Sequence, residues 1–457
     1  MIILKLERAS LKREKNRLIL ANGSERGDFV PLDYIFSNFG RIHDGIQIMK
    51  TYYPNDEVWS TKGRVSEFTN KKNVTYAWDY EYDDYSPFDI FEQGGETLKQ
   101  IEQIKYYGSD VHLTLTLDIS LPDNELIKIV KSLIPFGKVF LRINHEANGF
   151  WFSHNTRHTY EEVSKFFVRF HKIIKSYSSN IFTLFSLTGD LFVNERIVES
   201  RFLKLSDTDL KEALNIADYW SIDKYVSLNY GWPFTTELSD GTYFKGTVDD
   251  WWKLIEETYL KMIWHNNMIA KPLFINEFAS DSDVDGYEGQ ALIISDIYNR
   301  LSRGEFEWLE GIVLYQFRDY GGLGLEKGDL NQYERIPSLG AYKESIKKFK
   351  YKIVIDEEEQ KFVDYSFYWF DSDSIRGLKI SEIGEAKCFT NMFKFSIYVV
   401  HGEEQHWARL ESGESMQLDD IHEFILLVPP FKNDKGSIIT SANIKNITEK
   451  VMECFNS

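Results

Sequence analysis

The chain has 457 residues, of which 43% are hydrophobic and 15% are aromatic, so it can bury a large core and exceeds one average domain. Its formal net charge of −18 argues against a nucleic-acid partner or an anionic-membrane partner, because both require a basic surface. With only two cysteines, Cys388 and Cys454, a disulfide framework and a four-cysteine zinc site are excluded.

The first twenty residues, MIILKLERASLKREKNRLIL, are rich in charge and lack the long apolar run of a secretory signal. No later stretch of about 18 apolar residues predicts a membrane span. We therefore expect a cytoplasmic protein, or a secreted one whose leader was removed. The oligomeric state is not indicated.

Short β-rich runs alternate with longer segments of helical period through the first 350 residues. The runs are 33–40, 73–80, 111–118, 139–146, 181–188, 220–230, 272–279 and 311–319. Segments between them, such as 159–177 and 247–266, carry apolar residues at helical spacing. Apolar strands that alternate with helices indicate a parallel sheet covered by helices, and eight such units predict a (β/α)8 TIM barrel.

A doubly wound open sheet is the competing α/β architecture. It would be expected to open with a glycine-rich phosphate turn after its first strand. The segment GRIHDGIQIMK, which follows Phe39, lacks GxGxxG, and the chain contains no GxxxxGK[ST]. The barrel is therefore favoured.

The alternation stops near Lys350, and short period-two runs separated by turn residues follow. This pattern predicts a small antiparallel β-sandwich. We expect residues 1–350 to form the catalytic barrel, with an N-terminal extension at 1–32, and residues 351–457 to form the sandwich. No polar or proline-rich linker separates the two, so we expect the sandwich to pack on the barrel as a structural domain.

In a TIM barrel, catalytic groups lie at the carboxyl ends of the strands. The fourth run ends in Asn144, His145 and Glu146, and the seventh ends in Asn276 and Glu277. Two carboxylates at the ends of non-adjacent strands suit glycoside hydrolysis, in which one acts as a proton donor and the other as a nucleophile.

A sugar substrate also needs flat apolar faces and hydrogen-bonding side chains around it. Aromatic and polar residues at the predicted strand ends and in the loops after them supply both. The predicted substrate-binding residues are Asn38, Arg41, His43, Trp78, Asn144, His145, Trp151, Tyr230, Trp232, Gln316 and Arg318.

A metal-dependent hydrolase is the alternative chemistry, because His154 and His158 have i, i+4 spacing close to His145. An HExxH zinc helix would need histidine at position 149, where Gly149 stands. We therefore predict no metal site and a reaction that needs no cofactor.

Two segments resemble glycoside hydrolase family 26. RINHEANGFWF is similar to the His-Glu-x-Asn-Gly-x-Trp segment that carries the acid/base of that family, and KPLFINEFAS is similar to its nucleophile segment. The resemblance implies a retaining (β/α)8 enzyme of clan A, with Glu146 as acid/base and Glu277 as nucleophile. It also implies a sugar-site role for His145 and Trp151, and β-mannan as the first substrate to expect.

The sequence departs from this family in two places. Ser153, His154 and Asn155 follow the Trp-Phe pair, and Gln316 and Phe317 stand where the family commonly has a tryptophan. A related clan A enzyme acting on β-xylan or mixed-linkage β-glucan therefore stays open, as does a non-catalytic carbohydrate-binding barrel. The tyrosine that touches the nucleophile is expected to be Tyr230, with Tyr225 as the alternative.

Each candidate also has a purely structural interpretation. Glu146 could pair with Arg142, and Glu277 could lie beside a helix cap. Trp151 and Trp232 each fit a core position as well as a sugar platform. The tryptophans at 251, 252 and 264 lie on a helical period, and we expect them in the core.

Overall fold

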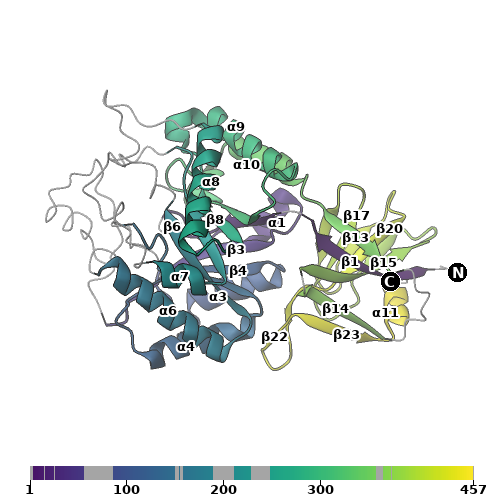
Figure 1. The fold of residues 1–457 in the computed structure, drawn as a ribbon. Coiled ribbons are helices and arrows are strands. Elements are labelled where there is room, and N and C mark those ends of the chain that lie inside the picture. The colour runs from purple at the N-terminus through teal and green to yellow at the C-terminus, as the bar shows by residue number, and fades with distance from the viewer. Residues whose placement is uncertain are drawn as a thin grey trace.

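The computed structural model describes residues 4–14, 16–24, 26–55, 86–149, 154, 158–188, 210–227, 247–356, 364–371 and 373–455. A closed barrel of eight parallel strands lies beside an antiparallel β domain (Figure 1). The predicted fold class, a TIM barrel followed by a β-sandwich domain, is confirmed.

The barrel strands follow one another around the barrel in chain order. They are β2 (Arg17–Ala21), β3 (Gly45–Tyr52), β4 (Asp110–Leu117), β5 (Val139–Ile143), β6 (Ile181–Thr188), β7 (Tyr219–Asp223), β8 (Leu273–Phe278) and β9 (Leu309–Leu314). Each pairs with the next in parallel, and β2 pairs with β9 to close the barrel.

One helix follows each strand among the described residues. These helices are α1 (Leu32–Phe39), α3 (Glu96–Tyr106), α4 (Asp123–Leu133), α6 (Tyr160–Tyr177), α7 (Lys211–Ile216), α8 (Val248–His265), α9 (Ser282–Ser302) and α10 (Pro337–Ile346), and a short 3-10 turn spans Ile134–Phe136. Their apolar faces pack on the strands in one continuous core.

One of the eight predicted strands is wrong, and the structure does not test another. The run 33–40 is helix α1, because Leu32, Ile35 and Phe39 form a buried face at helical spacing and Gly40 ends the helix in the left-handed conformation. The run 73–80 lies outside the described residues. The first two barrel strands are instead β2 and β3, so the fourth and seventh strands are still those that precede Glu146 and contain Glu277.

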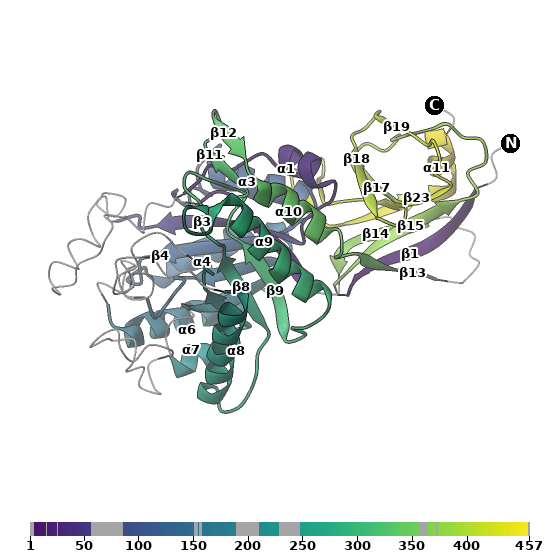
Figure 2. The same cartoon turned by 90° about the horizontal axis from the view of Figure 1, so that it is seen from above.

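The predicted boundary at the N-terminus is wrong, because residues 1–32 are not one extension of the barrel. Strand β1 (Lys5–Arg13) pairs antiparallel with β13 (Tyr351–Ile355) and β15 (Ser374–Ser381) in the second domain. Both ends of the chain therefore lie in that domain, where β1 runs beside β13 and β15 (Figure 2).

The remaining elements of the second domain follow β13. They are β14 (Asp364–Asp371), β16 (Cys388–Thr390), β17 (Ile397–His401), β18 (His406–Leu410), β19 (Ser415–Gln417), β20 (Glu423–Leu427), β21 (Phe431–Lys432), β22 (Ile438–Ile439), β23 (Ser441–Lys445) and α11 (Ile447–Phe455). One large sheet has the order β13-β1-β15-β20-β17-β18, and β14 and β23 extend it beside β15.

The two faces of this sheet are apolar for different reasons. Along β17, Ile397 and Val399 join a cluster that includes α11, whereas Tyr398 and Val400 join a second cluster on the opposite face. The second cluster also contains Ile42, which directly precedes the barrel residues that lead into β3. Period-two alternation thus gives the sheet one face for its own core and one for the barrel.

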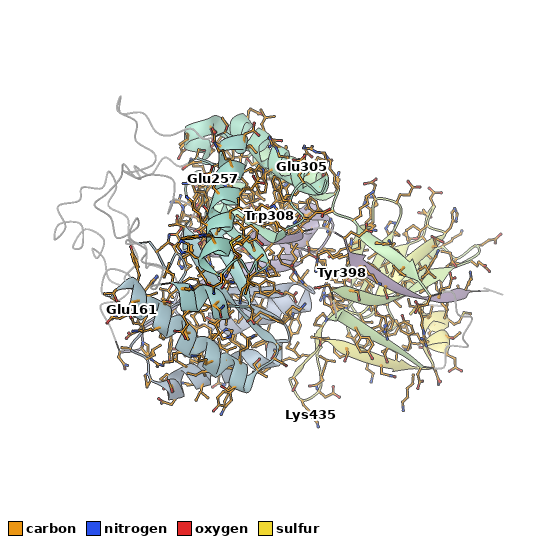
Figure 3. All side chains as sticks on the ribbon, in the orientation of Figure 1. Glu161, Glu257, Glu305, Trp308, Tyr398 and Lys435 are labelled. Carbon is orange, nitrogen blue, oxygen red and sulfur yellow. The ribbon has the colours of Figure 1, made fainter. Side chains whose placement is uncertain are left out.

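Several hydrogen bonds join the sheet to the barrel. The Tyr398 hydroxyl donates to the Tyr107 carbonyl at 2.9 Å, and the Trp369 indole N–H donates to the Gly108 carbonyl at 2.5 Å. Figure 3 shows Tyr398 at the junction of the two domains. The second domain therefore packs on the barrel through its own buried side chains, as the missing linker predicts.

The tryptophans of α8 divide between core and surface. Trp251 and Trp252 are buried as expected, but the expectation for Trp264 is wrong, because 61% of its side chain is exposed. The apolar stripe of α8 therefore ends one turn before the helix does. No helix among the described residues is long and apolar enough to cross a lipid bilayer.

Candidate active site

The turn after β5 holds Glu146 at the carboxyl end of the barrel. Asn144 and Glu146 both adopt positive φ angles, of 45° and 49°, which residues with a Cβ rarely do. The Ala147 amide donates to the Ser186 carbonyl in β6 at 2.9 Å. Sparsely populated backbone conformations of this kind are concentrated at functional sites, and this one presents a half-buried glutamate.

Asn144 anchors this turn from the other side. Its Oδ1 accepts from the Leu117 amide at 2.6 Å, and its Nδ2 donates to the Leu117 carbonyl at 3.2 Å. Both polar ends of the buried side chain are therefore bound to the end of β4. The structure gives Asn144 a role in shaping the turn, and its contact with substrate stays a prediction.

His145, which directly precedes the acid/base candidate, is buried. Burial holds the pKa of its imidazole well below the usual range, and the nearby Arg142 guanidinium acts in the same direction. His145 is therefore neutral at physiological pH. A neutral ring beside Glu146 does not favour loss of the proton that an acid catalyst must keep.

Glu277 is the penultimate residue of β8, and the residue is 6% exposed. Oε1 accepts from Nη2 of Arg142, and Oε2 accepts from the Tyr225 hydroxyl at 2.9 Å. Each oxygen thus has a fixed donor. The expected tyrosine Tyr230 lies outside the described residues, and the alternative, Tyr225, makes the contact.

Arg142 reaches Glu277 through the interior of the barrel. Its position in β5, two residues before Asn144, directs the guanidinium inward, where Nε donates to the Thr114 hydroxyl at 2.8 Å. Nη1 donates to Oδ2 of Asp223 at 2.6 Å. One guanidinium therefore bonds to two carboxylates, which lie on the neighbouring strands β7 and β8.

Asp223 is a site residue that the sequence interpretation missed. It ends β7, is 1% exposed, and accepts a second hydrogen bond from the Ser186 hydroxyl at 3.0 Å. Burial raises the pKa of its carboxyl to about 7; Arg142 opposes this shift, and the charge of Glu277 adds to it. The sequence did contain a signal for this residue, because Asp223 is the single carboxylate in the run 220–230. The strand in that run ends at Asp223.

The residues that follow β9, the eighth strand of the barrel, form a wall at the carboxyl end of the barrel. Gln316 follows β9, and its Oε1 accepts from the Ser24 hydroxyl at 3.1 Å, so its buried amide is held against the loop after β2. Arg318 bonds to Oε2 of Glu326 at 2.6 and 2.9 Å and lies 3.7 Å from the centre of the Tyr333 ring. Both residues therefore hold the wall.

Arg318 belongs to a small sheet that rises from this wall. Its strands are β10 (Arg318–Asp319), β11 (Glu326–Gly328) and β12 (Tyr333–Arg335). Asp319 joins it to the loop after β2, since its two oxygens accept from Nε and Nη2 of Arg26 at 2.9 and 3.0 Å. Ion pairs to buried carboxylates therefore hold this small sheet together and join it to the loop after β2.

The structure does not bring Asn38, Arg41 or His43 to the glutamates, so these three predictions are wrong. Asn38 lies in α1 and donates to the Tyr34 carbonyl. Arg41 donates to the carbonyl of Ile346, the last residue of α10, and to that of Phe349. His43 precedes β3 and lies against Tyr342. The sequence interpretation took α1 for a barrel strand, so it placed these residues at the carboxyl end of the barrel. Because α1 is a helix that leads back to the start of β3, they lie at the opposite end.

Four predicted sugar-binding residues lie outside the described residues: Trp78, Trp151, Tyr230 and Trp232. Within the described part of the chain, no group of three His, Cys, Asp or Glu side chains is arranged to hold a metal ion.

No family model matches the sequence, and no curated protein matches it. Among solved structures, an alpha-L-arabinofuranosidase from Thermotoga maritima is 11% identical, with a TM-score of 0.44, and the match covers 96% of this chain and 99% of that one. An endo-beta-1,4-mannanase from Thermotoga petrophila is 13% identical, with a TM-score of 0.40, and the match covers 94% and 98% of the two chains.

A family 39 glycoside hydrolase from Bacteroides cellulosilyticus WH2 is 11% identical, with a TM-score of 0.44, and the match covers 91% of this chain and 81% of that one. The structural neighbours named here are thus glycoside hydrolases.

Proposed function

We propose that the chain is a retaining glycoside hydrolase that cleaves β-linked glycans, with β-mannan as the first substrate to test. One observation carries the proposal: Glu277 lies at the carboxyl end of β8 with each oxygen fixed by a donor, Arg142 or Tyr225. A nucleophilic carboxylate needs this kind of fixed orientation toward the reacting carbon.

The reaction takes two displacements. Glu146, protonated, donates its proton to the glycosidic oxygen while Glu277 attacks the anomeric carbon from the opposite face, and the C–O bond to the leaving group breaks. Glu146, now a carboxylate, removes a proton from water as that water attacks the glycosyl ester. Glu277 is released as a carboxylate, Glu146 regains its proton, and no cofactor is consumed.

The neighbours of the two glutamates suit these roles. Neutral His145 adds no positive charge beside Glu146, so it does not favour loss of the catalytic proton. The Tyr225 hydroxyl keeps Glu277 aligned as the sugar approaches. We propose Trp78, Trp151, Tyr230 and Trp232 as the aromatic platforms of the sugar, on the basis of the sequence alone.

The choice of β-mannan rests on the family 26 resemblance of the two glutamate segments. A different β-glycan is the second candidate, and a specific observation favours it. Where that family commonly has a tryptophan near the reacting sugar, this chain has Gln316, whose side chain is buried against Ser24. The wall beside the sugar therefore differs in shape and stacking ability, which are the properties that select a glycan.

The test combines a substrate panel with substitution of the nucleophile. Purified wild type is assayed on aryl β-glycosides, β-mannan, β-xylan and mixed-linkage β-glucan, and a 2-deoxy-2-fluoro aryl glycoside of the best sugar is used as a covalent trap. We expect mass spectrometry to locate the label on Glu277. Glu277→Gln should lose both hydrolysis and labelling, because an amide does not attack the anomeric carbon.

Glu310→Gln is the matched control, because Glu310 is a β9 glutamate paired with Arg17 and is outside the proposed site. It should keep both activities. If the wild type binds glycan but hydrolyses no substrate of the panel, and Glu277→Gln leaves that binding unchanged, the chain is a carbohydrate-binding barrel and the proposal is wrong.

A further inference from the structure

Arg142 serves two buried carboxylates, although the proposed reaction uses only one. The guanidinium is 1% exposed, and it bonds to Asp223 at 2.6 Å as well as to Glu277. A buried carboxylate costs folding free energy unless it is paired, so a second one beside the nucleophile calls for a reason.

We infer that Asp223 is a positioning residue for the proposed reaction: through Arg142 it supplies the charge that balances the guanidinium while Glu277 is held as a glycosyl ester. The inference rests on the proposed function, since it concerns the covalent intermediate.

The charges of the three side chains carry this inference. In the free enzyme with Asp223 ionised, the two carboxylates and Arg142 sum to −1. When Glu277 becomes an ester it is neutral, so Asp223 and Arg142 sum to zero. Without the Asp223 charge, the same step would leave Arg142 as an uncompensated buried cation, which is costly in a low-dielectric interior.

Ionised Asp223 also makes Glu277 a better nucleophile. Asp223 pairs with the same guanidinium as Glu277, so Arg142 neutralises Glu277 less completely. In addition, Asp223 places a second negative charge on the strand adjacent to that of Glu277. Both effects raise the energy of the free carboxylate relative to the ester, in which the charge has gone.

The surroundings of Asp223 determine when it is ionised. It faces Arg142 from β5, Glu277 from β8, and the Ser186 hydroxyl from β6, while Oδ1 has no hydrogen-bond partner among the described residues. Burial raises the pKa of Asp223 to about 7. The carboxyl therefore gains its negative charge as pH rises through neutrality.

The kinetic test uses Asp223→Asn, which keeps the shape and removes the charge. Formation of the ester should slow, so kcat/KM on activated aryl glycosides should fall by about tenfold to a hundredfold, the range for loss of an interaction with a charged group. Hydrolysis of the ester, which returns the Glu277 carboxylate to Arg142, should become easier. The kcat value should therefore fall less than kcat/KM does. The burst that reports accumulated ester should disappear.

The pH profile separates this role from a merely structural one. In the wild type, kcat/KM should rise with pH through an apparent pKa near 7. This rise is one limb of the pH profile, and Asp223→Asn should lack it. Ser186→Ala removes a hydrogen bond that stabilises ionised Asp223, so the limb should move to higher pH. This milder variant keeps the test available if Asp223→Asn does not fold.

Asp110→Asn is the matched control for loss of a buried carboxylate. Asp110 is 1% exposed and pairs with Arg17 at 3.3 Å and Lys105 at 3.4 Å, at the start of β4 and hence at the other end of the barrel. Asp110→Asn should reduce stability about as much as Asp223→Asn does, while it keeps the limb of the pH profile and the burst.

Infrared spectra should also show a protonated-carboxyl C=O band that titrates near neutral pH in the wild type and is absent from Asp223→Asn.

Two failures can be told apart. If the wild type hydrolyses glycosides but Asp223→Asn keeps the limb, the burst and the infrared band, the inference is wrong and the proposed function stands. If the wild type hydrolyses no glycoside and Glu277 takes no label, the proposed function fails, and the inference fails with it.

Discussion

The Tyr351 hydroxyl of β13 donates a 2.7 Å hydrogen bond to Oδ1 of Asp44, the residue that precedes β3. Arg13 of β1 pairs with the same carboxylate at 2.9 Å, and the Leu18 amide of β2 donates to its other oxygen at 2.8 Å. One buried aspartate thus joins two strands of the β domain to the first strand of the barrel.

We predict that Asp44→Asn loosens the docking of the two domains. It leaves Arg13 without its buried counter-charge, which costs on the order of 3 to 5 kcal/mol of unfolding free energy. Urea unfolding monitored by circular dichroism measures the loss. Asp33→Asn, at an exposed position in α1, is the control and should change stability little. Equal stability of the two variants would show that the Asp44 contacts contribute nothing.

The pKa of Asp44 gives the pH range of this contribution. Burial would raise the pKa, but Arg13, the Leu18 amide and the Tyr351 hydroxyl lower it from the usual 3.8 to about 2. The folded pKa lies below the unfolded one, so the stabilisation is present above about pH 4 and is lost as pH falls through about 2. The part of the stabilisation that depends on pH amounts to about 2 kcal/mol, and the larger cost given for Asp44→Asn is that of breaking the buried pair.

Removal of the second domain should destabilise the barrel. A chain that ends near Lys350 lacks β13 and β15, so β1 loses both of its partners and the apolar cluster around Ile42 becomes exposed. We expect aggregation or a much lower melting temperature, measured by scanning calorimetry. A truncated chain that stays folded and hydrolyses soluble substrate would contradict a structural role for the domain.

Tyr225→Phe tests the alignment of the proposed nucleophile. The phenyl ring can keep its edge-to-face contact with Tyr315, while the hydroxyl that donates to Glu277 is lost. We expect a kcat/KM reduced by about tenfold to a hundredfold, with little change in melting temperature. Tyr177→Phe, at an exposed position on α6, should leave the rate unchanged. A rate equal to that of the wild type would remove Tyr225 from the site.

Much of this arrangement follows from local patterns in the sequence. The period of two in strands and of 3.6 in helices predicts the barrel, and the rule that catalytic groups lie at carboxyl ends places Glu146 and Glu277 on it. The run 33–40 failed because its aromatic residues favour a strand locally, although packing against the barrel selects a helix.

Other parts of the site depend on contacts between distant positions. Strand β1 pairs with segments more than 330 residues away in the chain, and no local pattern indicates that pairing. Arg142 lies 81 positions from Asp223 and 135 from Glu277, and only closure of the barrel brings the three side chains together. The sequence interpretation therefore located both glutamates but not the ion cluster behind one of them.

The buried histidines predict how stability depends on pH. Five of them are buried among the described residues: His43, His112, His145, His154 and His171. Burial lowers the pKa of each; it is about 3 for His43 and His154 and about 4 for His171. The unfolded chain binds more protons below about pH 6.5, so stability falls as pH falls through that value.

Each such histidine costs about 1.4 kcal/mol of unfolding free energy per pH unit between its unfolded and folded pKa. Asp223 acts in the opposite direction, because its raised pKa favours the folded state as pH falls below 7, but it is one group against five. Urea unfolding at pH 7.5 and 5.5 should show the loss, and His43→Gln should reduce it. Equal stability at the two pH values would be incompatible with neutral buried histidines.

Glu146→Ala tests the remaining half of the proposed mechanism. Substrates with good leaving groups depart without protonation, so ester formation on Glu277 should persist for them, whereas unactivated glycans should lose about a hundredfold to ten-thousandfold in rate. The ester should then accumulate, because no base activates water. Added azide is a nucleophile that needs no base, so it should restore turnover and give a glycosyl azide of β configuration, the product of attack on an α-linked ester. The product is identified by proton NMR, and Glu125→Ala, at a half-buried position in α4, is the control that should show neither effect. An equal loss on activated and unactivated substrates, with no azide product, would remove Glu146 as the acid/base.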